Sequence, residues 1–199
     1  MHLQPGKNIR LFQHPFLERC TYVHPALPLA IWGPVILGSV AYPLYGQAVT
    51  KLQALAWFFL GLLFWSLAEY VLHRYVFHFK PKGKFQERVS FLIHGIHHED
   101  PEDARRLLMP PLAGILIALP FYALFLAAFG VMIGHLFFAG FITGYLCYDY
   151  THFAVHFMRP KSKFFKTLKQ NHMMHHFVTQ NRRYGVSSTF WDHVFGTRG

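Results

Sequence analysis

Three long stretches of the chain contain no Asp, Glu, Lys or Arg. They lie between Arg19 and Lys51, between Lys51 and Glu69, and between Arg106 and Asp149. The last stretch holds 42 residues, whereas a helix crosses the hydrocarbon core of a bilayer with about 20 apolar residues. This stretch therefore predicts two membrane-spanning helices that are joined by a turn near Gly130 to Gly134.

The two earlier stretches predict another pair of spanning helices, with a turn at Gly46 to Lys51. The four predicted spans cover residues 26–46, 52–72, 110–130 and 132–150. Four prolines make the first span the least regular: Pro25, Pro28, Pro34 and Pro43. The alternative is the core of a soluble helical protein, but a soluble chain of 199 residues rarely has so long an uncharged stretch. The pattern thus predicts an all-α integral membrane protein with four transmembrane helices in two hairpins.

The charge balance agrees with a membrane protein and orients it. Only 14% of the residues are charged, against roughly 25% in an average soluble domain, and 19 Lys and Arg outnumber 9 Asp and Glu. Lys51 is the one basic residue in the turn of a predicted hairpin, so the positive-inside rule places both termini and residues 73–109 and 151–199 in the cytoplasm. Basic residues beside spans are typical of a surface that faces anionic lipids, and no nucleic acid partner is expected.

We expect residues 1–25 to form a cytoplasmic N-terminal segment and residues 26–199 to form a single membrane-embedded domain. A cleavable signal peptide is not expected, because the first apolar run starts late and no clear cleavage site follows it. The two cysteines, Cys20 and Cys147, are too few for a disulfide framework.

Histidine is unusually frequent, with 15 residues, and ten of these fall into four clusters beside the predicted spans. The clusters are His73 and His78; His94, His97 and His98; His152 and His156; and His172, His175 and His176. On a helix, residues three or four positions apart share a face, whereas adjacent residues point in different directions. A segment with the pattern HxxHH can therefore supply ligands to two metal ions at once.

Ten imidazoles are enough for two metal centres with about five ligands each, so we expect a helical, cytoplasmic cap that holds two metals. Helical spacing predicts a first group of His73, His78, His94, His98 and His175. It predicts a second group of His97, His152, His156, His172 and His176. Neutral imidazole suits Fe, Zn, Cu or Ni, and the spacing does not choose among these metals.

Two acidic residues lie one helical turn before a clustered histidine. Glu69 precedes His73 by four positions and Asp149 precedes His152 by three. We expect each carboxylate to accept an imidazole N–H and so to orient the ligand. The alternative for Glu69 is an ordinary charge at the end of an interfacial helix.

Five motifs in order resemble the fatty acid hydroxylases, and among them most nearly the fatty acid 2-hydroxylases that act on sphingolipid acyl chains. These motifs are HRYVFH, LIHGIHH followed by RRLLMPP, YDYTHFAVH, HMMHH and STFWDHVFGT. The resemblance extends from Glu69 to Thr197. It implies an integral-membrane di-iron enzyme that uses O2 to hydroxylate C2 of a long acyl chain, with the ten clustered histidines as ligands. The resemblance also implies that zinc can replace iron in overexpressed protein.

The resemblance also bears on the residues behind the ligands and on the source of electrons. Asp192 and His193 lie in the closing motif and are expected behind the ligands. Yeast and animal members of the family carry a fused cytochrome b5 domain with an HPGG motif, whose glycines are missing after His14-Pro15 and His24-Pro25. A separate electron donor is therefore expected, either a cytochrome b5-type protein or a ferredoxin with its reductase.

The expected active site lies on the cytoplasmic face of a bacterial inner membrane or of the endoplasmic reticulum. The third motif ends in His156-Phe157, where relatives often have two consecutive histidines, but ten ligands remain. One alternative is a related di-iron enzyme that acts on a sterol or a carotenoid. Another is a membrane metal transporter, which would need ligands near the bilayer midplane, where only His135 is expected. The choice among free fatty acid, acyl-CoA and ceramide as substrate stays open.

Overall fold

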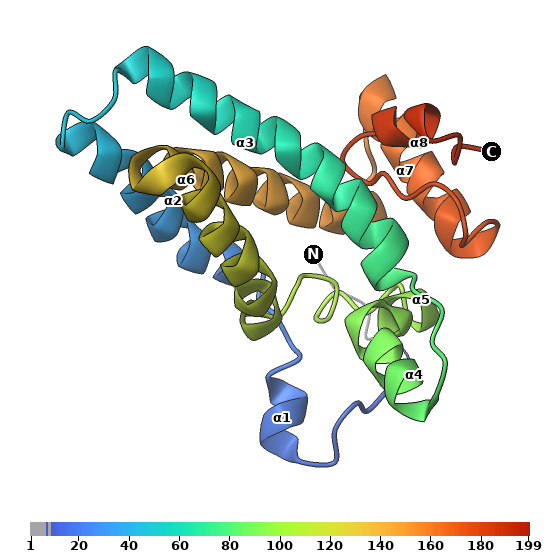
Figure 1. Ribbon diagram of the computed structural model, residues 1–199. Helices are drawn as coiled ribbons and strands as arrows, with labels where there is room; N and C mark the ends of the chain where they lie inside the picture. Colours follow the sequence, from blue (N-terminus) through green and yellow to red (C-terminus); the bar gives the residue numbers. More distant parts are fainter. Residues whose placement is uncertain (1–6, 8) are drawn as a thin grey trace. The chain divides into compact units, whose positions relative to one another are not determined.

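The computed structural model describes Lys7 and residues 9–199, and no β-strand occurs among these residues. In chain order the helices are α1 (Pro15–Arg19), α2 (Leu27–Tyr45), α3 (Lys51–Val71), the π-helix η1 (Leu72–Phe77), α4 (Lys84–Ser90), the π-helix η2 (Phe91–Gly95), α5 (Ile96–Glu99), α6 (Pro111–Phe157), α7 (Lys163–Phe177) and α8 (Phe190–Val194) (Figure 1). The prediction of an all-helical protein is confirmed over the described residues. Residues 1–6 and 8 of the expected N-terminal segment lie outside them.

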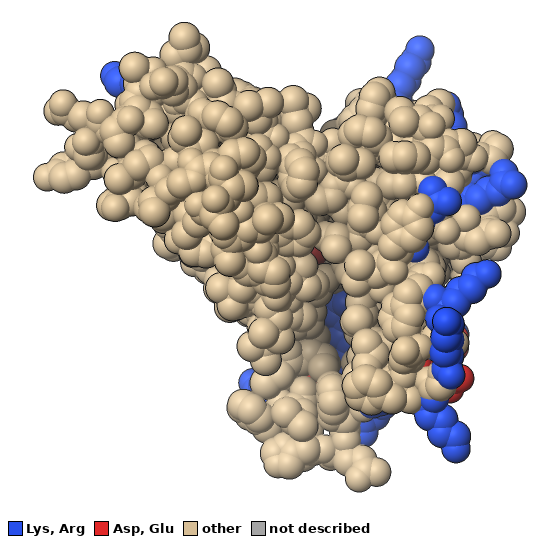
Figure 2. Space-filling model, in the orientation of Figure 1, with Lys and Arg blue, Asp and Glu red and all other residues tan. Residues whose placement is uncertain are grey.

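The chain forms two compact units, which we describe separately. The apolar unit consists of His24–Leu67 and Met109–Cys147, and the histidine unit consists of Met1–Val23, Ala68–Leu108 and Tyr148–Gly199. Lys51 is the single charged residue of the apolar unit, so all other Asp, Glu, Lys and Arg residues belong to the histidine unit. On the face drawn in Figure 2, Lys and Arg side chains accordingly gather over the region of α4, α5 and α7.

Three helices are long and apolar enough to cross a membrane, which indicates an integral membrane protein. They extend over Leu27–Tyr45, Lys51–Phe77 and Pro111–Phe157. The first is a continuous helix although it contains Pro34 and Pro43. The count of four spans therefore depends on α6, whose 47 residues are twice what one crossing needs.

Helix α6 is a hairpin of two helical arms. Gly130 interrupts it with φ 76° and ψ 169°, a backbone conformation that is essentially restricted to glycine. Ring contacts join the arms in antiparallel order, with centroids 4.8 Å apart for Phe121 and Phe141 and 4.7 Å apart for Phe125 and Phe137. The chain thus reverses inside the predicted turn at residues 130–134, and a crossing by each arm would give the four predicted spans.

Close backbone contact between α3 and α6 holds the apolar unit together. A Cβ atom on Gly140 would lie 1.8 Å from the carbonyl oxygen of Phe58, and one on Gly61 would lie 2.0 Å from that of Phe137. Small residues at such positions let membrane helices approach closely. The two glycines therefore belong to the helix interface rather than to turns.

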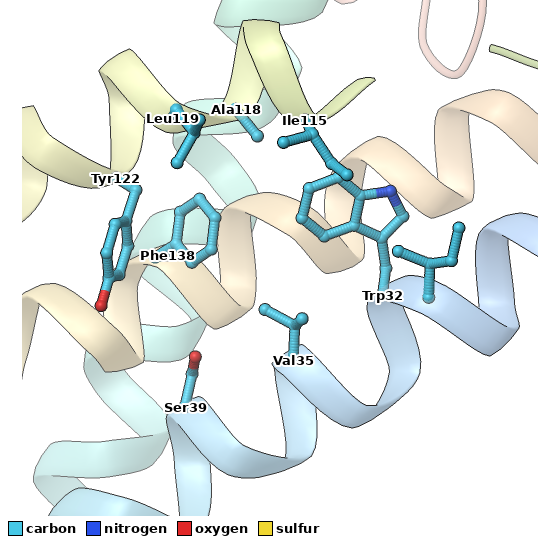
Figure 3. A pocket seen from close by; sticks show the side chains of 9 residues that line it. Trp32, Val35, Ser39, Ile115, Ala118, Leu119, Tyr122 and Phe138 are labelled. Carbon is cyan, nitrogen blue, oxygen red and sulfur yellow. The ribbon is translucent and has the colours of Figure 1, made fainter. Parts of the chain in front are cut away.

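A cavity of about 290 Å³ lies between α2 and the two arms of α6 in the apolar unit (Figure 3). Its wall is almost entirely apolar, with Trp32, Val35 and Phe138 prominent in it.

The hydroxyl of Tyr122 lies 3.1 Å from Nε2 of His135, whose Nδ1 donates to the carbonyl of Val131 at 2.6 Å. The one histidine expected at depth thus has two hydrogen-bond partners on its own helix.

The N-terminal segment is packed into the histidine unit. Arg106 lies at the centre of this contact, and its guanidinium pairs with the carboxylates of Glu18 and Asp103. Glu18 also accepts the backbone N–H groups of Leu11 and Phe12, each at 2.9 Å. The side chain of Arg106 is only 5% exposed, so this is a buried ionic network that fastens residues 11–18 to the segment that follows the second histidine cluster.

Candidate metal centre

His73 and His78 come to one face through a π-helix. They are five positions apart, a spacing that does not share a face in an α-helix but does where the backbone bonds run from residue i+5 to residue i. The N–H of His78 donates to the carbonyl of His73 at 3.2 Å, and the two ring centroids are 5.1 Å apart. The α-helical spacing used for the sequence prediction does not reveal this, because the π-helix η1 is set by the surrounding packing.

The HGIHH segment divides its histidines between two directions. His94 lies on η2, and His97 and His98 lie on the single turn of α5. Nε2 of His94 lies 3.1 Å from Nε2 of His98. Nε2 of His97 lies 2.9 Å from Nε2 of His152, on α6. The adjacent residues His97 and His98 thus face different partners, as the sequence predicts.

Helix α7 divides its histidines in the same way. Ser162 caps the start of this helix by accepting the N–H of Phe165 at 3.3 Å. Nε2 of His172 lies 2.8 Å from that of His156 and 3.1 Å from that of His176. His175 turns away from these residues, and its Nε2 lies 3.0 Å from that of His78.

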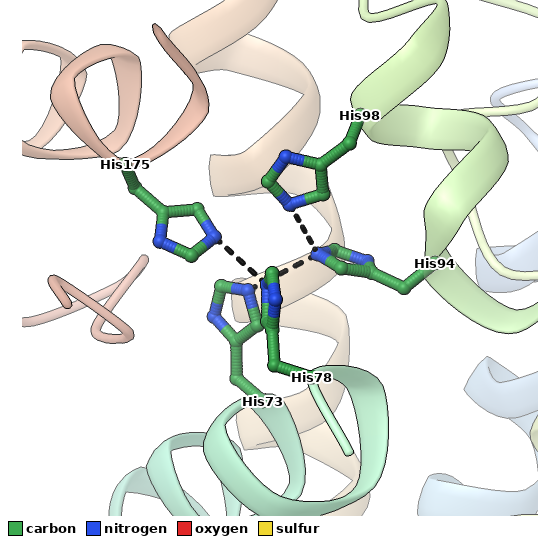
Figure 4. A group of neighbouring side chains, drawn as sticks. All are labelled: His73, His78, His94, His98 and His175. Atoms are coloured by element: carbon green, nitrogen blue, oxygen red, sulfur yellow. Dashed lines mark hydrogen bonds between the residues drawn. The ribbon is translucent and has the colours of Figure 1, made fainter. Parts of the chain in front are cut away.

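The ten clustered histidines therefore form two groups of five that could each hold a metal ion. The first group is His73, His78, His94, His98 and His175, and the second is His97, His152, His156, His172 and His176. Within each group the ligand atoms all lie within 4.8 Å of one another. Figure 4 shows the rings of the first group converging from η1, η2, α5 and α7 on one point. The membership of the groups is the one expected from the sequence, although α-helical spacing does not by itself explain why His73 and His78 share a group.

The geometry of the first group fits a bound cation. Nδ1 of His73 donates to the carbonyl of Tyr184 at 2.6 Å, and Nδ1 of His175 donates to that of Arg182 at 2.6 Å. A neutral imidazole that donates through Nδ1 has a lone pair on Nε2. The Nε2 atoms in contact are 3.0–3.2 Å apart, and two nitrogen ligands at a right angle, each about 2.1 Å from a metal, would be about 3 Å apart.

The histidines are held in the neutral form that metal binding requires. Burial, together with the neighbouring His175, lowers the pKa of His78 to about 4. Burial also lowers the pKa of His98 to about 3, together with the neighbouring imidazoles. Burial takes the pKa of His97 and His172 well below the ordinary value. At neutral pH these rings therefore offer lone pairs rather than positive charge.

Glu69 does not have the partner that the sequence predicts. Its carboxylate accepts the backbone N–H groups of Val186 at 2.7 Å and Ser187 at 2.8 Å, and also the hydroxyl of Ser187. The imidazole of His73 donates to the carbonyl of Tyr184 instead. The buried N–H groups of residues 186 and 187 need acceptors, and Glu69 supplies them, so it contacts a loop rather than a ligand.

The other three acidic or polar residues expected behind the ligands have different surroundings. Asp149 is buried in α6, and its contact with an imidazole stays a prediction. Asp192 is fully buried and accepts the N–H groups of Tyr184 and Gly185. His193 is exposed, with Nδ1 donating to the carbonyl of Thr189 at 2.7 Å. The structure does not bring His193 together with either histidine group.

Two groups of buried imidazoles, in a chain with helices long enough to span a bilayer, define a membrane protein with a histidine-rich site able to hold two metal ions. The family model for fatty acid hydroxylases matches residues 58–197, and the chain belongs to this family.

Curated relatives agree with that assignment. The chain is 36% identical over 190 residues to dihydroceramide fatty acyl 2-hydroxylase FAH1 of Arabidopsis thaliana, covering 94% of this chain and 79% of that protein. It is 36% identical over 189 residues to ceramide very long chain fatty acid hydroxylase SCS7 of Saccharomyces cerevisiae, with 94% of this chain and 47% of the yeast protein covered. It is 36% identical over 219 residues to the fatty acid 2-hydroxylase of Mus musculus, with 99% and 58% covered.

A solved structure has the same fold. It is the structure of full-length scs7p in which only the hydroxylase domain is visible, with a TM-score of 0.87 and 37% sequence identity, covering 92% of this chain and 69% of that one. Family membership and these relatives make the protein a hydroxylating oxidoreductase of lipid metabolism.

Proposed function

We propose that this protein is an O2-dependent di-iron hydroxylase that adds a hydroxyl group to C2 of a long-chain fatty acid or of a sphingolipid N-acyl chain. The observation that carries the proposal is the pair of five-histidine groups in a chain of this family. The names of the Arabidopsis, yeast and mouse relatives support acyl chains of ceramides or fatty acids as the substrate class.

The chain's own residues would bind, orient and shield the metals. Two iron ions held by the ten histidines would supply the activation of O2 and the attack on an unactivated C–H bond, which no side chain provides. The Tyr184 ring packs 5.7 Å from the rings of both His73 and His78, and Phe77 stacks on His94 at 5.3 Å. These rings exclude water from the first group and keep its imidazoles neutral.

Position C2 follows from how a lipid is held. An acyl chain whose polar head stays at the interface presents the carbon next to its carbonyl at a fixed depth. Glu69 and Asp149 end two of the uncharged stretches, and His73 and His152 follow them by four and three positions, where a span is expected to leave the membrane. A reaction further along the acyl tail would require the chain to pass this level before it reacts.

The electrons would come from a separate donor on the cytoplasmic side, such as a cytochrome b5-type protein or a ferredoxin with its reductase. The basic residues of the histidine unit support a cytoplasmic position for the site and its donor, because the positive-inside rule assigns such residues to the cytoplasm. A metal transporter is not favoured: both histidine groups lie in the histidine unit, and His135 of the apolar unit is bonded to Tyr122. Relatives named as acyl hydroxylases support an acyl substrate over a sterol or a carotenoid.

Expression with a reductase in a host that lacks 2-hydroxy lipids, followed by lipid mass spectrometry, tests the proposal. The wild type and the His135→Ala control should produce 2-hydroxy acyl chains. His152→Ala and His176→Ala should abolish the product while the protein stays in the membrane, because each opens a metal shell. Hydroxylation elsewhere on the chain, a sterol or carotenoid product, or activity in the two histidine variants would refute the assignment.

A further inference from the structure

Two ligands of the first group are oriented by one loop. The carbonyls of Arg182 and Tyr184 accept the Nδ1–H groups of His175 and His73, each at 2.6 Å. These two contacts fix which ring nitrogen carries the proton and which way each ring faces. Both histidines belong to the first group.

Two buried carboxylates accept hydrogen bonds from the backbone N–H groups of the same loop. Asp192 accepts the N–H of Tyr184 at 2.8 Å and that of Gly185 at 2.9 Å. Glu69 accepts the next two backbone N–H groups, that of Val186 at 2.7 Å and that of Ser187 at 2.8 Å. Four consecutive N–H groups, those of residues 184–187, are therefore bonded to two side chains, one on α3 and one on α8, that are 4% and 0% exposed.

The second group lacks an equivalent support at two of its ligands. Nδ1 of His172 and Nδ1 of His176 are buried and have no hydrogen-bond partner among the described residues. In the first group, Nδ1 of His98 is the one ring nitrogen among the described residues that is likewise buried without a hydrogen-bond partner. The two ligand rings that the loop orients, those of His73 and His175, thus both belong to the first group.

We propose that Glu69 and Asp192 are positioning residues that hold the 182–187 loop so that its carbonyls orient His73 and His175. Loss of either carboxylate should then weaken metal binding by the first group and spare the second. This inference rests on the proposed metal-binding function. Removal of such outer partners typically lowers metal affinity by about 10–100-fold, and we expect a change of that size at one site.

The first test is the metal content of the full-length purified protein after dialysis against a chelator. Glu69→Gln keeps the size of the side chain but removes the charge, and should reduce the content from about two ions per chain to about one. Glu18→Gln is the matched control, because Glu18 also accepts two backbone N–H groups, at 2.9 Å, in a segment without ligands. Asp192→Asn should behave like Glu69→Gln, and Ser187→Ala should weaken the same site more mildly.

Combination with ligand variants identifies which ion is lost. His78→Ala opens the first group and His156→Ala opens the second, so each alone should leave about one ion per chain. Adding Glu69→Gln should cause no further loss in His78→Ala, but should remove the remaining ion in His156→Ala. Helical content and elution volume in detergent show whether each variant is folded. If Glu69→Gln does not fold, Ser187→Ala and Asp192→Asn decide the question.

The proposal is overturned if Glu69→Gln or its substitutes keep both ions as Glu18→Gln does, lose both equally, or lose the ion that survives in His78→Ala. Failure of the proposed metal-binding function would give a different result: neither His78→Ala nor His156→Ala would change the metal content.

Discussion

Gly185 shows how closely the loop behind the first histidine group is packed. A Cβ atom there would lie 2.0 Å from the carbonyl oxygen of Ser188 and 2.9 Å from a carboxylate oxygen of Asp192. No real side chain tolerates such contacts, so the loop has to move if the residue is enlarged. The glycine therefore allows Asp192 to reach the backbone of residues 184 and 185.

Gly185→Ala should destabilise the protein and loosen one metal ion. Overpacking of a filled site costs about 1–3 kcal/mol, which should appear as a lower Tm in detergent. The displaced loop should also lower the metal content toward one ion per chain. Gly83→Ala is the control, because nothing lies within 4 Å of a Cβ at Gly83. Equal Tm values for the two variants would contradict this explanation.

At the level of single residues, the histidine groups were predictable and their supports were not. Spacing of three or four along a helix separates His97 from His98 and His175 from His176, and this needs no knowledge of the fold. Glu69, by contrast, bonds residues 186 and 187, more than a hundred positions away along the chain. Local spacing places Glu69 beside His73, but its carboxylate oxygens accept hydrogen bonds from a loop that is distant in the sequence.

At the level of elements, the pattern of uncharged stretches predicts the helices and the hairpin but not how tightly they pack. The turn at Gly130 follows from the length of one stretch. The role of Gly61 and Gly140 could not be inferred, because a glycine at a helix crossing looks the same in sequence as one that starts a turn. The π-helices η1 and η2 were likewise not predictable, since their wider turns depend on tertiary contacts.

Gly140→Ala should separate α3 from α6 within the apolar unit. The added Cβ would be 1.8 Å from the carbonyl oxygen of Phe58, and backbone cannot move aside as a flexible side chain can. We expect a marked drop in thermal stability in detergent, at least as large as for Gly185→Ala. Gly38→Ala on α2 should have little effect, because a Cβ there has no neighbour within 4 Å. A Gly140→Ala protein as stable as the control would show that the two helices are not in this contact.

At the level of the whole molecule, the guanidinium of Arg106 is a central contact of the N-terminal segment, with Glu18, Thr21 and Tyr22 as its partners there. Arg106→Met should release residues 9–23 from the rest of the histidine unit, because it removes the guanidinium that pairs with the carboxylate of Glu18. Removing one partner from a buried pair costs about 3–5 kcal/mol. Faster protease cleavage after Phe12 or Phe16 is the expected observation, and Arg159→Met, at an exposed position, is the control. Unchanged cleavage would mean that the segment is held by other contacts.

The predicted topology can be tested directly with reporter fusions. Reporters placed after residues 48 and 132 should read as the side opposite the cytoplasm, since these positions lie in the turns of the two hairpins. A reporter after residue 82 should read as cytoplasmic. A cytoplasmic signal at residue 48 or residue 132 would rule out the arrangement of four spans.

The composition of the histidine unit has a consequence for how the protein is made. Each group combines histidines that precede α6 with histidines on α6 or after it: His175 joins four histidines of residues 68–108, and His97 joins four of residues 148–199. Neither set is complete until the ribosome has synthesised α7, because each set includes at least one histidine of that helix. If the two groups bind metal as proposed, loading would have to follow the synthesis of α7, and a chain terminated before α7 would have no complete site for an ion.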